Sequence, residues 1–206
     1  MAHCARINLN PRFIVRQAVP HNILILQKDI KKWNGNLATC AQVLQREKNK
    51  SLKNFDFNGF SNFLANKDKV VDIFYYNAEL DVSHNSEKYK SQKEFFEILK
   101  KIPNFHLILC KLLKRNIAGT DKIYYIIKED DINMAVDMVE GACGDSFDIA
   151  IVVSGDGDFV PAVKAVQRKN KAVENVYFKN SSSRNLKNHC DKSLELTKEI
   201  LDELFK

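Results

Sequence analysis

Residues 147–161 read Phe147-Asp148-Ile149-Ala150-Ile151-Val152-Val153-Ser154-Gly155-Asp156-Gly157-Asp158-Phe159-Val160-Pro161. The run from Ile149 to Val153 is continuously apolar and mostly β-branched, which predicts a strand covered on both faces within a parallel sheet. Asp156 and Asp158 follow this strand, and a helix is expected after them. In open α/β sheets the ligand site lies beyond the carboxyl ends of the strands. Two acids in that place repel each other unless a cation or a proton joins them, so the stretch predicts a divalent metal site.

The rest of the chain alternates between strand and helix patterns. Further strands are predicted over Ile23–Leu26, Val70–Tyr76, Phe105–Leu113, Lys122–Lys128 and Ala172–Phe178. Helices are predicted over Leu37–Gln45, Phe57–Leu64, Phe95–Ile102, Ile132–Val139, Val160–Gln167 and Ser193–Phe205. The polar segment Asp81–Ser91 is expected to be a loop. This alternation predicts the α/β class with a mostly parallel central sheet, in a single domain over residues 21–206 preceded by an irregular arm over residues 1–20.

Composition sets broad limits on the function. The chain has 206 residues, of which 45% are hydrophobic and 28% charged, as in ordinary globular domains. It has no apolar run of the ~20 residues that a membrane span needs and no secretory signal at its start, and its five scattered cysteines suggest reduced thiols and a cytoplasmic location. The net charge of +6 favours a polyanionic partner only mildly, because a lysine-rich solvated surface would give the same value.

A second acidic cluster, Lys128-Glu129-Asp130-Asp131, stands between the strand that ends near Lys128 and the helix over Ile132–Val139. Acids at a helix start commonly serve as N-caps. Their position at a strand-to-helix junction also brings them to the same sheet edge as Asp156 and Asp158. Carboxylates that converge there would form an oxygen site for Mg²⁺ or Mn²⁺, and such an ion activates water for attack on a phosphodiester.

Three motifs carry a resemblance to a known family. They are Phe74-Tyr75-Tyr76-Asn77-Ala78, Lys128-Glu129-Asp130-Asp131-Ile132-Asn133-Met134-Ala135-Val136-Asp137-Met138 and Ser154-Gly155-Asp156-Gly157-Asp158-Phe159-Val160-Pro161. In this order they resemble the NYN domain, a branch of the PIN-like nuclease superfamily, and within it the LabA-like group. The segment Cys190–Leu196 also resembles the family's tail. The resemblance implies a Rossmann-like three-layer α/β/α fold with an acidic metal pocket, and metal-dependent RNA cleavage in active members.

Carried over onto this chain, the resemblance gives Asp131, Asp156 and Asp158 as catalytic and metal-binding acids. Asp137 and Lys128 match accessory positions, the first catalytic and the second substrate-binding. Asp131 and Asp137 are six residues apart, roughly 240° around an ideal helix. Both can therefore face one pocket only if Asp131 lies at the non-helical cap, and Asp137 could instead bond to a neighbouring loop.

The chain departs from the family at its first strand, which in the family ends in an aspartate followed by glycine and then asparagine. Either Asp29 supplies the acid from an altered loop, or Asn34 stands in the catalytic position, with Asn36 near the family's substrate-binding asparagine. Asparagine can coordinate a metal through its carbonyl, but it lacks the negative charge and cannot act as a base.

Basic residues follow the second acid motif. Lys164 and Arg168 are predicted to bind substrate, together with Ser154, which is expected to cap its loop. The full basic set is Lys164, Arg168, Lys169, Lys171, Lys179, Arg184 and Lys187, with Lys111, Lys114 and Arg115 beyond it. A positive rim around an acidic centre suits a phosphodiester backbone, although a solvated helix face would look alike. Tyr124 and Tyr125 are expected in the core because they lie in a strand.

Other chemistries find no support in the sequence. It has no Ser-His-Asp order or nucleophile elbow, no Walker A lysine motif or EF-hand pattern, and no ligand spacing among its five histidines. We therefore predict a Mg²⁺- or Mn²⁺-dependent ribonuclease that cuts single-stranded RNA internally and possesses no membrane segment; a homodimer is compatible with the sequence. The alternative is a degenerate NYN domain that binds RNA or a protein without cutting.

Overall fold

The structure, a computed structural model, describes residues 22–28, 52–82, 86–120, 123–178 and 183–204. Its strands are β1 (Asn22–Lys28), β2 (Lys69–Asn77), β3 (Phe105–Leu109), β4 (Lys111–Asn116), β5 (Ile123–Lys128), β6 (Ile149–Val153), β7 (Ala172–Tyr177) and β8 (Lys192–Glu195). Its helices are η1 (Leu52–Asn54), α2 (Phe57–Ala65), α3 (Ser86–Leu99), α4 (Asp130–Cys143), η2 (Gly157–Phe159), α5 (Val160–Gln167), α6 (Arg184–His189) and α7 (Lys198–Glu203). The arm predicted over residues 1–20 and the helix predicted over Leu37–Gln45 lie outside the described residues.

Six strands form one sheet in the order β3-β2-β1-β6-β7-β8. All five pairings between neighbours are parallel, which confirms the predicted parallel sheet. At the carboxyl end of β1, Lys28 pairs with Tyr76 of β2 and Gln27 pairs with Val153 of β6. The carboxyl ends of β1, β2 and β6 therefore lie side by side at one edge of the sheet.

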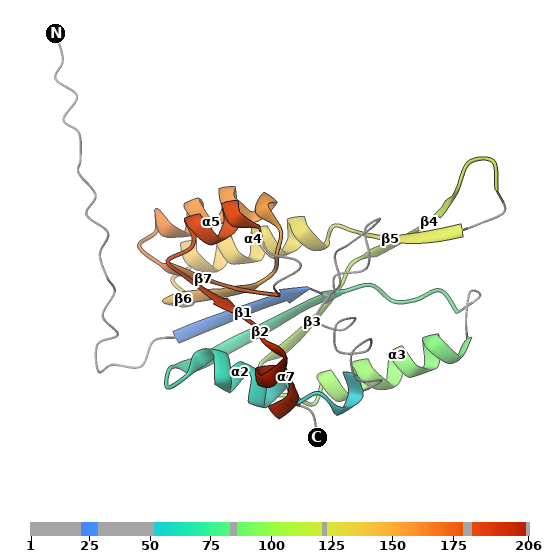
Figure 1. Cartoon of the computed structure of the whole chain (residues 1–206), viewed down its shortest axis with the longest axis horizontal. Coiled ribbons are helices and arrows are strands. Elements are labelled where there is room, and N and C mark those ends of the chain that lie inside the picture. The colour runs from blue at the N-terminus through green and yellow to red at the C-terminus, as the bar shows by residue number, and fades with distance from the viewer. Residues whose placement is uncertain (1–21, 29–51, 83–85, 121–122, 179–182, 205–206) are drawn as a thin grey trace, which may run out of the picture.

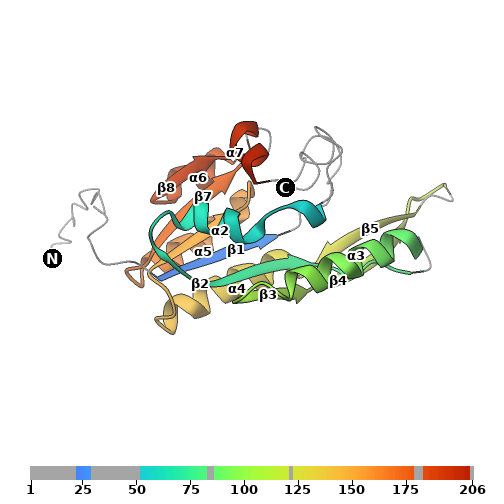
Figure 2. The same ribbon diagram turned by 90° about the horizontal axis from the view of Figure 1, so that it is seen from below.

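Helices cover both faces of the sheet, with α4 and α5 on one face and α2, α3 and α7 on the other (Figure 1). The view from below shows the second set lying against the sheet (Figure 2). Successive side chains of a strand point to opposite faces, so Ile151 of β6 joins the core under α2 and α3 while Val152 joins the core under α4 and α5. Every residue of β6 is buried. The predicted three-layer α/β/α fold, with β6 covered on both faces, is confirmed.

The single extended run predicted over Phe105–Leu113 is wrong, because the structure divides it. β3 ends at Leu109 in the main sheet, and the backbone N–H of Cys110 donates to the carbonyl of Asn77, the last residue of β2, at 2.6 Å. Because β2 ends at Asn77, the chain after Cys110 has no further backbone groups of β2 with which to pair. β4 instead pairs with β5 in a separate antiparallel ladder of six residue pairs.

The starts of two helices and one core assignment also differ from the prediction. The segment expected as a loop contains the first turns of α3, which starts at Ser86. These turns are polar because they face solvent, and their Glu, Lys and Gln residues are good helix formers. The predicted closing helix is preceded by β8, a four-residue edge strand with no continuous apolar run. Tyr124, expected in the core, is 45% exposed because β5 stands in a two-stranded ladder.

Candidate functional site

The junction between β6 and α5 holds its two acids in a hydrogen-bonded turn. Ser154 is buried directly after β6, and its Oγ accepts a hydrogen bond from the backbone N–H of Asp156 at 3.2 Å. Oδ1 of Asp156 in turn accepts from the N–H of Asp158 at 3.0 Å and so caps η2. Ser154 therefore caps the loop as the sequence predicts, and the backbone between the two acids is fixed by side chains of the motif itself.

Asn175 on β7 holds the same junction from the neighbouring strand. Its Nδ2 donates to the carbonyl oxygens of Val152, at 3.1 Å, and Ser154, at 2.8 Å. The N–H of Ser154 donates to the carbonyl of Val176 at 3.1 Å. Asn175 and Ser154 are both buried. Hydrogen bonds to β7 thus fix the backbone where the chain leaves β6.

Close packing also explains the glycine between the acids. A Cβ added at Gly157 would lie 2.8 Å from Oγ of Ser183, the residue whose hydroxyl caps α6 by accepting from the N–H of Leu186 at 3.3 Å. Phe159, the last residue of η2, is buried in the core under α4 and α5. Asp158 remains exposed. The junction is anchored on both sides, while one of its carboxylates faces solvent.

The junction between β5 and α4 is built differently. Asp130 and Asp131 occupy the first turn of α4, and Glu129 is the N-cap residue. Glu129 has a φ of 75°, in the left-handed region, and its side chain makes no capping bond. A residue with a Cβ pays about 1–2 kcal/mol in this conformation. The carbonyl of Glu129 accepts from the N–H of Asn133 at 2.8 Å, so the backbone alone starts the helix.

Asp137 lies farther along α4 and bonds to the sheet. The hydroxyl of Tyr76, which is wholly buried on β2, donates to Oδ2 of Asp137 at 2.7 Å. Burial and this bond to the carboxylate both raise the pKa of Tyr76 far above its usual value. Asp131 is a helical residue and not a cap, so its side chain and that of Asp137 leave α4 in different directions, roughly 240° apart. Asp137 thus connects α4 to β2, and the sequence carries no sign of this contact.

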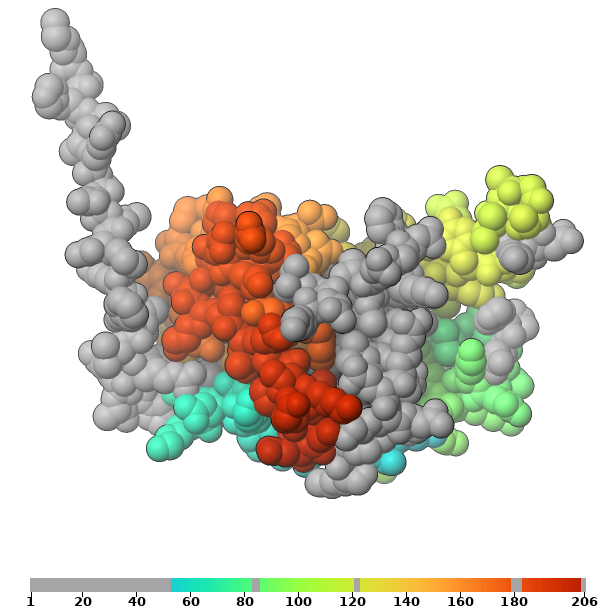
Figure 3. Space-filling model, viewed as in Figure 1, coloured from blue at the N-terminus to red at the C-terminus, as the bar shows by residue number. Residues whose placement is uncertain are grey.

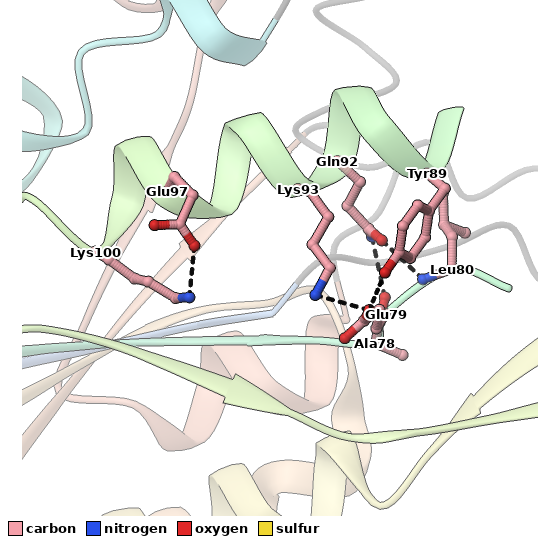
Figure 4. Close-up of polar contacts among 8 residues, drawn as sticks. All are labelled: Ala78, Glu79, Leu80, Tyr89, Gln92, Lys93, Glu97 and Lys100. Carbon is pink, nitrogen blue, oxygen red and sulfur yellow. Dashed lines mark hydrogen bonds and ion pairs between the residues drawn. The ribbon is translucent and has the colours of Figure 1, made fainter. Parts of the chain in front are cut away.

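The chain that leaves β2 is held by α3, whose first turns lie in the segment predicted to be a loop. The side-chain amide of Gln92 on α3 binds the backbone twice, accepting from the N–H of Leu80 at 2.8 Å and donating to the carbonyl of Ala78 at 3.0 Å (Figure 4). Oδ1 of Asn77 accepts from the N–H of Ala78 at 2.7 Å. The chain that leaves the sheet next to β1 is therefore fixed by α3.

Glu79, between these two backbone contacts, binds two further side chains of α3. Its Oε1 accepts from the hydroxyl of Tyr89 at 2.9 Å and pairs with Nζ of Lys93 at 2.8 Å (Figure 4). Lys93 and Tyr89 both lower the pKa of the Glu79 carboxyl. An acid at this edge is thus neutralised within the protein, whereas Asp158 forms no ion pair with any described residue.

The predicted basic rim is spread over two edges of the sheet. Lys128, at the end of β5, and Lys164, in the middle of α5, are exposed. Arg168 caps the carboxyl end of α5, at the far end of that helix from Asp158. Lys171 precedes β7 and pairs with Asp145, and with Asp148 at 3.5 Å, before β6. Lys171 therefore belongs to the opposite edge and not to the rim.

The remaining predicted site residues, Asn34 and Asn36, lie outside the described residues, as does Asp29. Carboxylate oxygens are the donors that Mg²⁺ and Mn²⁺ prefer, so the acids of the two junctions fit such an ion chemically. Within the described ranges, no three His, Cys, Asp or Glu side chains stand close enough together to hold a metal ion. Among the described helices, none has the length and apolar character needed to cross a membrane.

Comparison with known proteins gives two findings. The NYN domain family model matches residues 34–197, a range that begins after β1. A crystal structure of a protein of unknown function from Vibrio parahaemolyticus RIMD 2210633 superposes with a TM-score of 0.60 at 22% sequence identity. The similarity covers 90% of this chain and 99% of that one, and at this identity it shows the fold alone. No curated protein matches the chain significantly.

Proposed function

Because the chain belongs to the NYN domain family of PIN-like nucleases, we propose that it is a Mg²⁺- or Mn²⁺-dependent ribonuclease that cuts single-stranded RNA internally. The observation that supports this most is that both acidic junctions lie toward the carboxyl edge of one sheet, although their carboxylates do not form a three-ligand cluster in this structure. Asp156 and Asp158 follow β6, and Asp131 lies in the first turn of the helix that leads into β6. A helix that leads into a strand of a parallel sheet begins near the sheet's carboxyl edge. The acids Asp156 and Asp158 follow the carboxyl end of β6 at the same edge.

Each acid has a distinct part in the proposed site. Asp131, Asp156 and Asp158 would hold the metal ion, which when bound supplies an activated water and neutralises charge on the phosphodiester. Ser154 fixes the backbone of Asp156, so that its carboxylate is oriented before substrate arrives. Asp158 is exposed and so accessible to a bound strand. Asp137 keeps α4 in place through Tyr76.

The chain's own cations would bind the substrate. Lys128 borders the Asp131 junction and Lys164 follows the Asp158 junction, and both are exposed. Ammonium groups on either side of an acidic centre hold phosphate oxygens while the acids remain free for the ion. The free thiols of Cys110, Cys143 and Cys190 accord with a reducing compartment, and we place the enzyme in the cytoplasm.

A second candidate function is a degenerate NYN domain that binds RNA without cutting it. The feature that favours it is Asn34, which stands where the family resemblance leads us to expect an aspartate. An amide there would lower the negative charge of the site and could not take a proton from water. The family match begins at this residue, so it gives no support for an acid on β1.

Cleavage of a labelled single-stranded RNA in Mn²⁺ distinguishes the two functions. We expect Asp156→Asn to cut at least about 100-fold more slowly than the wild type, because it removes a charge from the ion's ligand set. The substitution retains Oδ1, so the hydrogen bond to the N–H of Asp158 can persist. Glu140→Gln is the matched control, since Glu140 is exposed near the other end of α4. A wild type that cuts no faster than Asp156→Asn, while both still bind the RNA, would establish the second candidate.

A further inference from the structure

We propose that the two strands of the β4–β5 hairpin, Lys111–Asn116 and Ile123–Lys128, form an arm that binds single-stranded RNA and leads it to the acidic edge of the sheet. The proposal rests on the proposed function for its choice of ligand. It assigns a substrate-binding surface to an element that, apart from Lys128, lies outside the three motifs. Four features of the hairpin support it: its place, its charge, its aromatic residues and its unfavourable cross-strand pairing.

The hairpin projects from the body of the molecule and begins and ends at the candidate site. Figure 1 shows β4 and β5 extending beyond the sheet, and the space-filling view shows their far end standing clear of the body (Figure 3). Six residue pairs at about 3.3 Å per residue give an arm of roughly 20 Å. Its first strand starts next to Cys110, which bonds to the end of β2, and its second strand ends next to Glu129. A strand of RNA lying along the arm would therefore reach the β5–α4 junction.

The charge on the two strands of the hairpin is of one sign; Asp121 and Lys122, between them, lie outside the described residues. The hairpin's described residues contain the cations Lys111, Lys114, Arg115 and Lys128 and no acid. None of the four forms an ion pair with another described residue, whereas Lys93 and Lys100 of α3 pair with Glu79 and Glu97. Cations that no described acid neutralises are available to phosphate groups.

One pairing in the ladder is unfavourable within the protein alone. Lys111 lies directly opposite Lys128 in the antiparallel register. Like charges at directly opposite positions destabilise a hairpin. A phosphate bound between the two ammonium groups would remove the repulsion, at the end of the arm nearest to the acids.

Aromatic side chains accompany the cations farther out. Arg115 lies opposite Tyr124, and Lys114 lies opposite Tyr125. Directly opposite residues share a face of the ladder, so each face of the arm carries a cation beside a tyrosine. Tyr124 is 45% exposed. Cations that follow a backbone and aromatic rings on which bases stack are the combination by which proteins bind single strands without reading sequence.

A second copy of the chain fits this surface less well. Exposed apolar residues do lie nearby, including Ile123 on the arm and Ile132 and Val136 on α4. Two hairpins brought together would, however, place the eight cations of their described strands against one another with no acid on those strands to offset them. Like charges across an interface oppose association, so the charge favours a polyanion over self-association.

RNA binding in EDTA, measured by fluorescence anisotropy over a series of salt concentrations, tests the proposal apart from cleavage. We expect the double variant Lys114→Gln/Arg115→Gln to bind about tenfold more weakly near physiological salt. The slope of log K against log salt should fall by about 1.4, since each lost phosphate contact on a single strand removes ~0.7. Tyr124→Ala should weaken binding about tenfold with an unchanged slope. The matched control, Lys67→Gln/Lys69→Gln, changes the charge equally at the start of β2, on the opposite edge.

The outcomes separate this proposal from the proposed function. Weaker binding with a smaller slope in the hairpin variant, and neither in the control, supports the arm even if the wild type cuts no RNA. Hairpin variants that bind RNA as the wild type does overturn the arm, even if the wild type cuts and Asp156→Asn does not. A hairpin variant that shifts from dimer to monomer in sedimentation, with RNA binding unchanged, would instead make the arm a contact between copies and overturn the proposal. Unchanged thermal midpoints exclude a folding defect as the cause of any loss.

Discussion

The two junctions that carry the acids are held by different parts of the molecule. The β6–α5 junction follows a strand at the centre of the sheet and is fixed by Ser154, by Asn175 on the next strand and by the buried ring of Phe159. The β5–α4 junction follows an exposed two-stranded ladder and turns through Glu129 in a left-handed conformation without a side-chain cap. One set of acids is thus positioned by the core, and the other by a helix start at the base of the hairpin.

This difference suggests a division of roles within one site. Ligands on a rigid element keep their geometry before substrate binds, which lowers the cost of assembling a metal site. Ligands beside a projecting arm can adjust as the arm engages a strand. We therefore expect substitutions at the β6 junction to change stability strongly, and those at the β5 junction to change it little while still affecting function.

The largest difference should come from alanine substitution of one apolar residue in each junction. Phe159→Ala should lower the free energy of unfolding by about 3–5 kcal/mol, because it leaves a cavity in the core under α4 and α5. Ile132→Ala should change it by less than about 0.5 kcal/mol, because Ile132 is 68% exposed. Urea unfolding measures both values. Similar costs for the two variants would break the comparison.

A pair of asparagines provides a smaller contrast. Asn175→Ala removes two hydrogen bonds to the chain leaving β6, at a cost of about 2 kcal/mol. Asn133 lies in α4, and among the described residues Asn133→Ala removes a 3.7 Å contact from its Nδ2 to Sγ of Cys110, between β3 and β4. Alanine also favours the helix. The variant's free energy of unfolding should stay within about 0.5 kcal/mol of the wild type. Thermal or urea unfolding of the two variants side by side would show a reversed order if the β5 junction were the more rigid one.

The smallest expected effect is a gain in stability. Glu129→Gly relieves the left-handed conformation of the cap residue and should raise the free energy of unfolding by up to about 1 kcal/mol. Part of the gain is offset because glycine also loosens the unfolded chain. Glu129→Ala, which keeps the Cβ, is the control and should give no gain. A loss of stability in Glu129→Gly would mean that the glutamate side chain itself holds the junction.

The sequence predicts the elements whose signal is local. β6 is recognisable because five consecutive apolar residues are buried on both faces, and the Ser154 cap is recognisable from a motif of five residues. The acids Asp131, Asp156 and Asp158 are proposed as site residues from the same kind of signal, since each belongs to a short pattern at a strand-to-helix boundary.

The features that the sequence does not predict depend on contacts between distant residues. The division of Phe105–Leu113 depends on where β2 ends, because the N–H of Cys110 bonds to the carbonyl of Asn77, the last residue of β2. No local pattern around Cys110 marks that point. The bond from Tyr76 to Asp137 joins positions 61 apart, and the clamp from Asn175 to Ser154 joins positions 21 apart. Polar side chains such as Gln92 give no sign in the sequence of the backbone groups that they bind.

Mn²⁺ binding to a pair of single variants and their double variant tests the central claim, that the two junctions serve one site. In calorimetric titrations without RNA, Asp131→Asn and Asp156→Asn should each weaken Mn²⁺ binding by at least about tenfold. The double variant should then be weakened by clearly less than the product of the two factors, because both acids act on the same ion. Wild-type affinity in Asp131→Asn, or two losses that simply multiply, would contradict the account and leave the β6 junction to act alone.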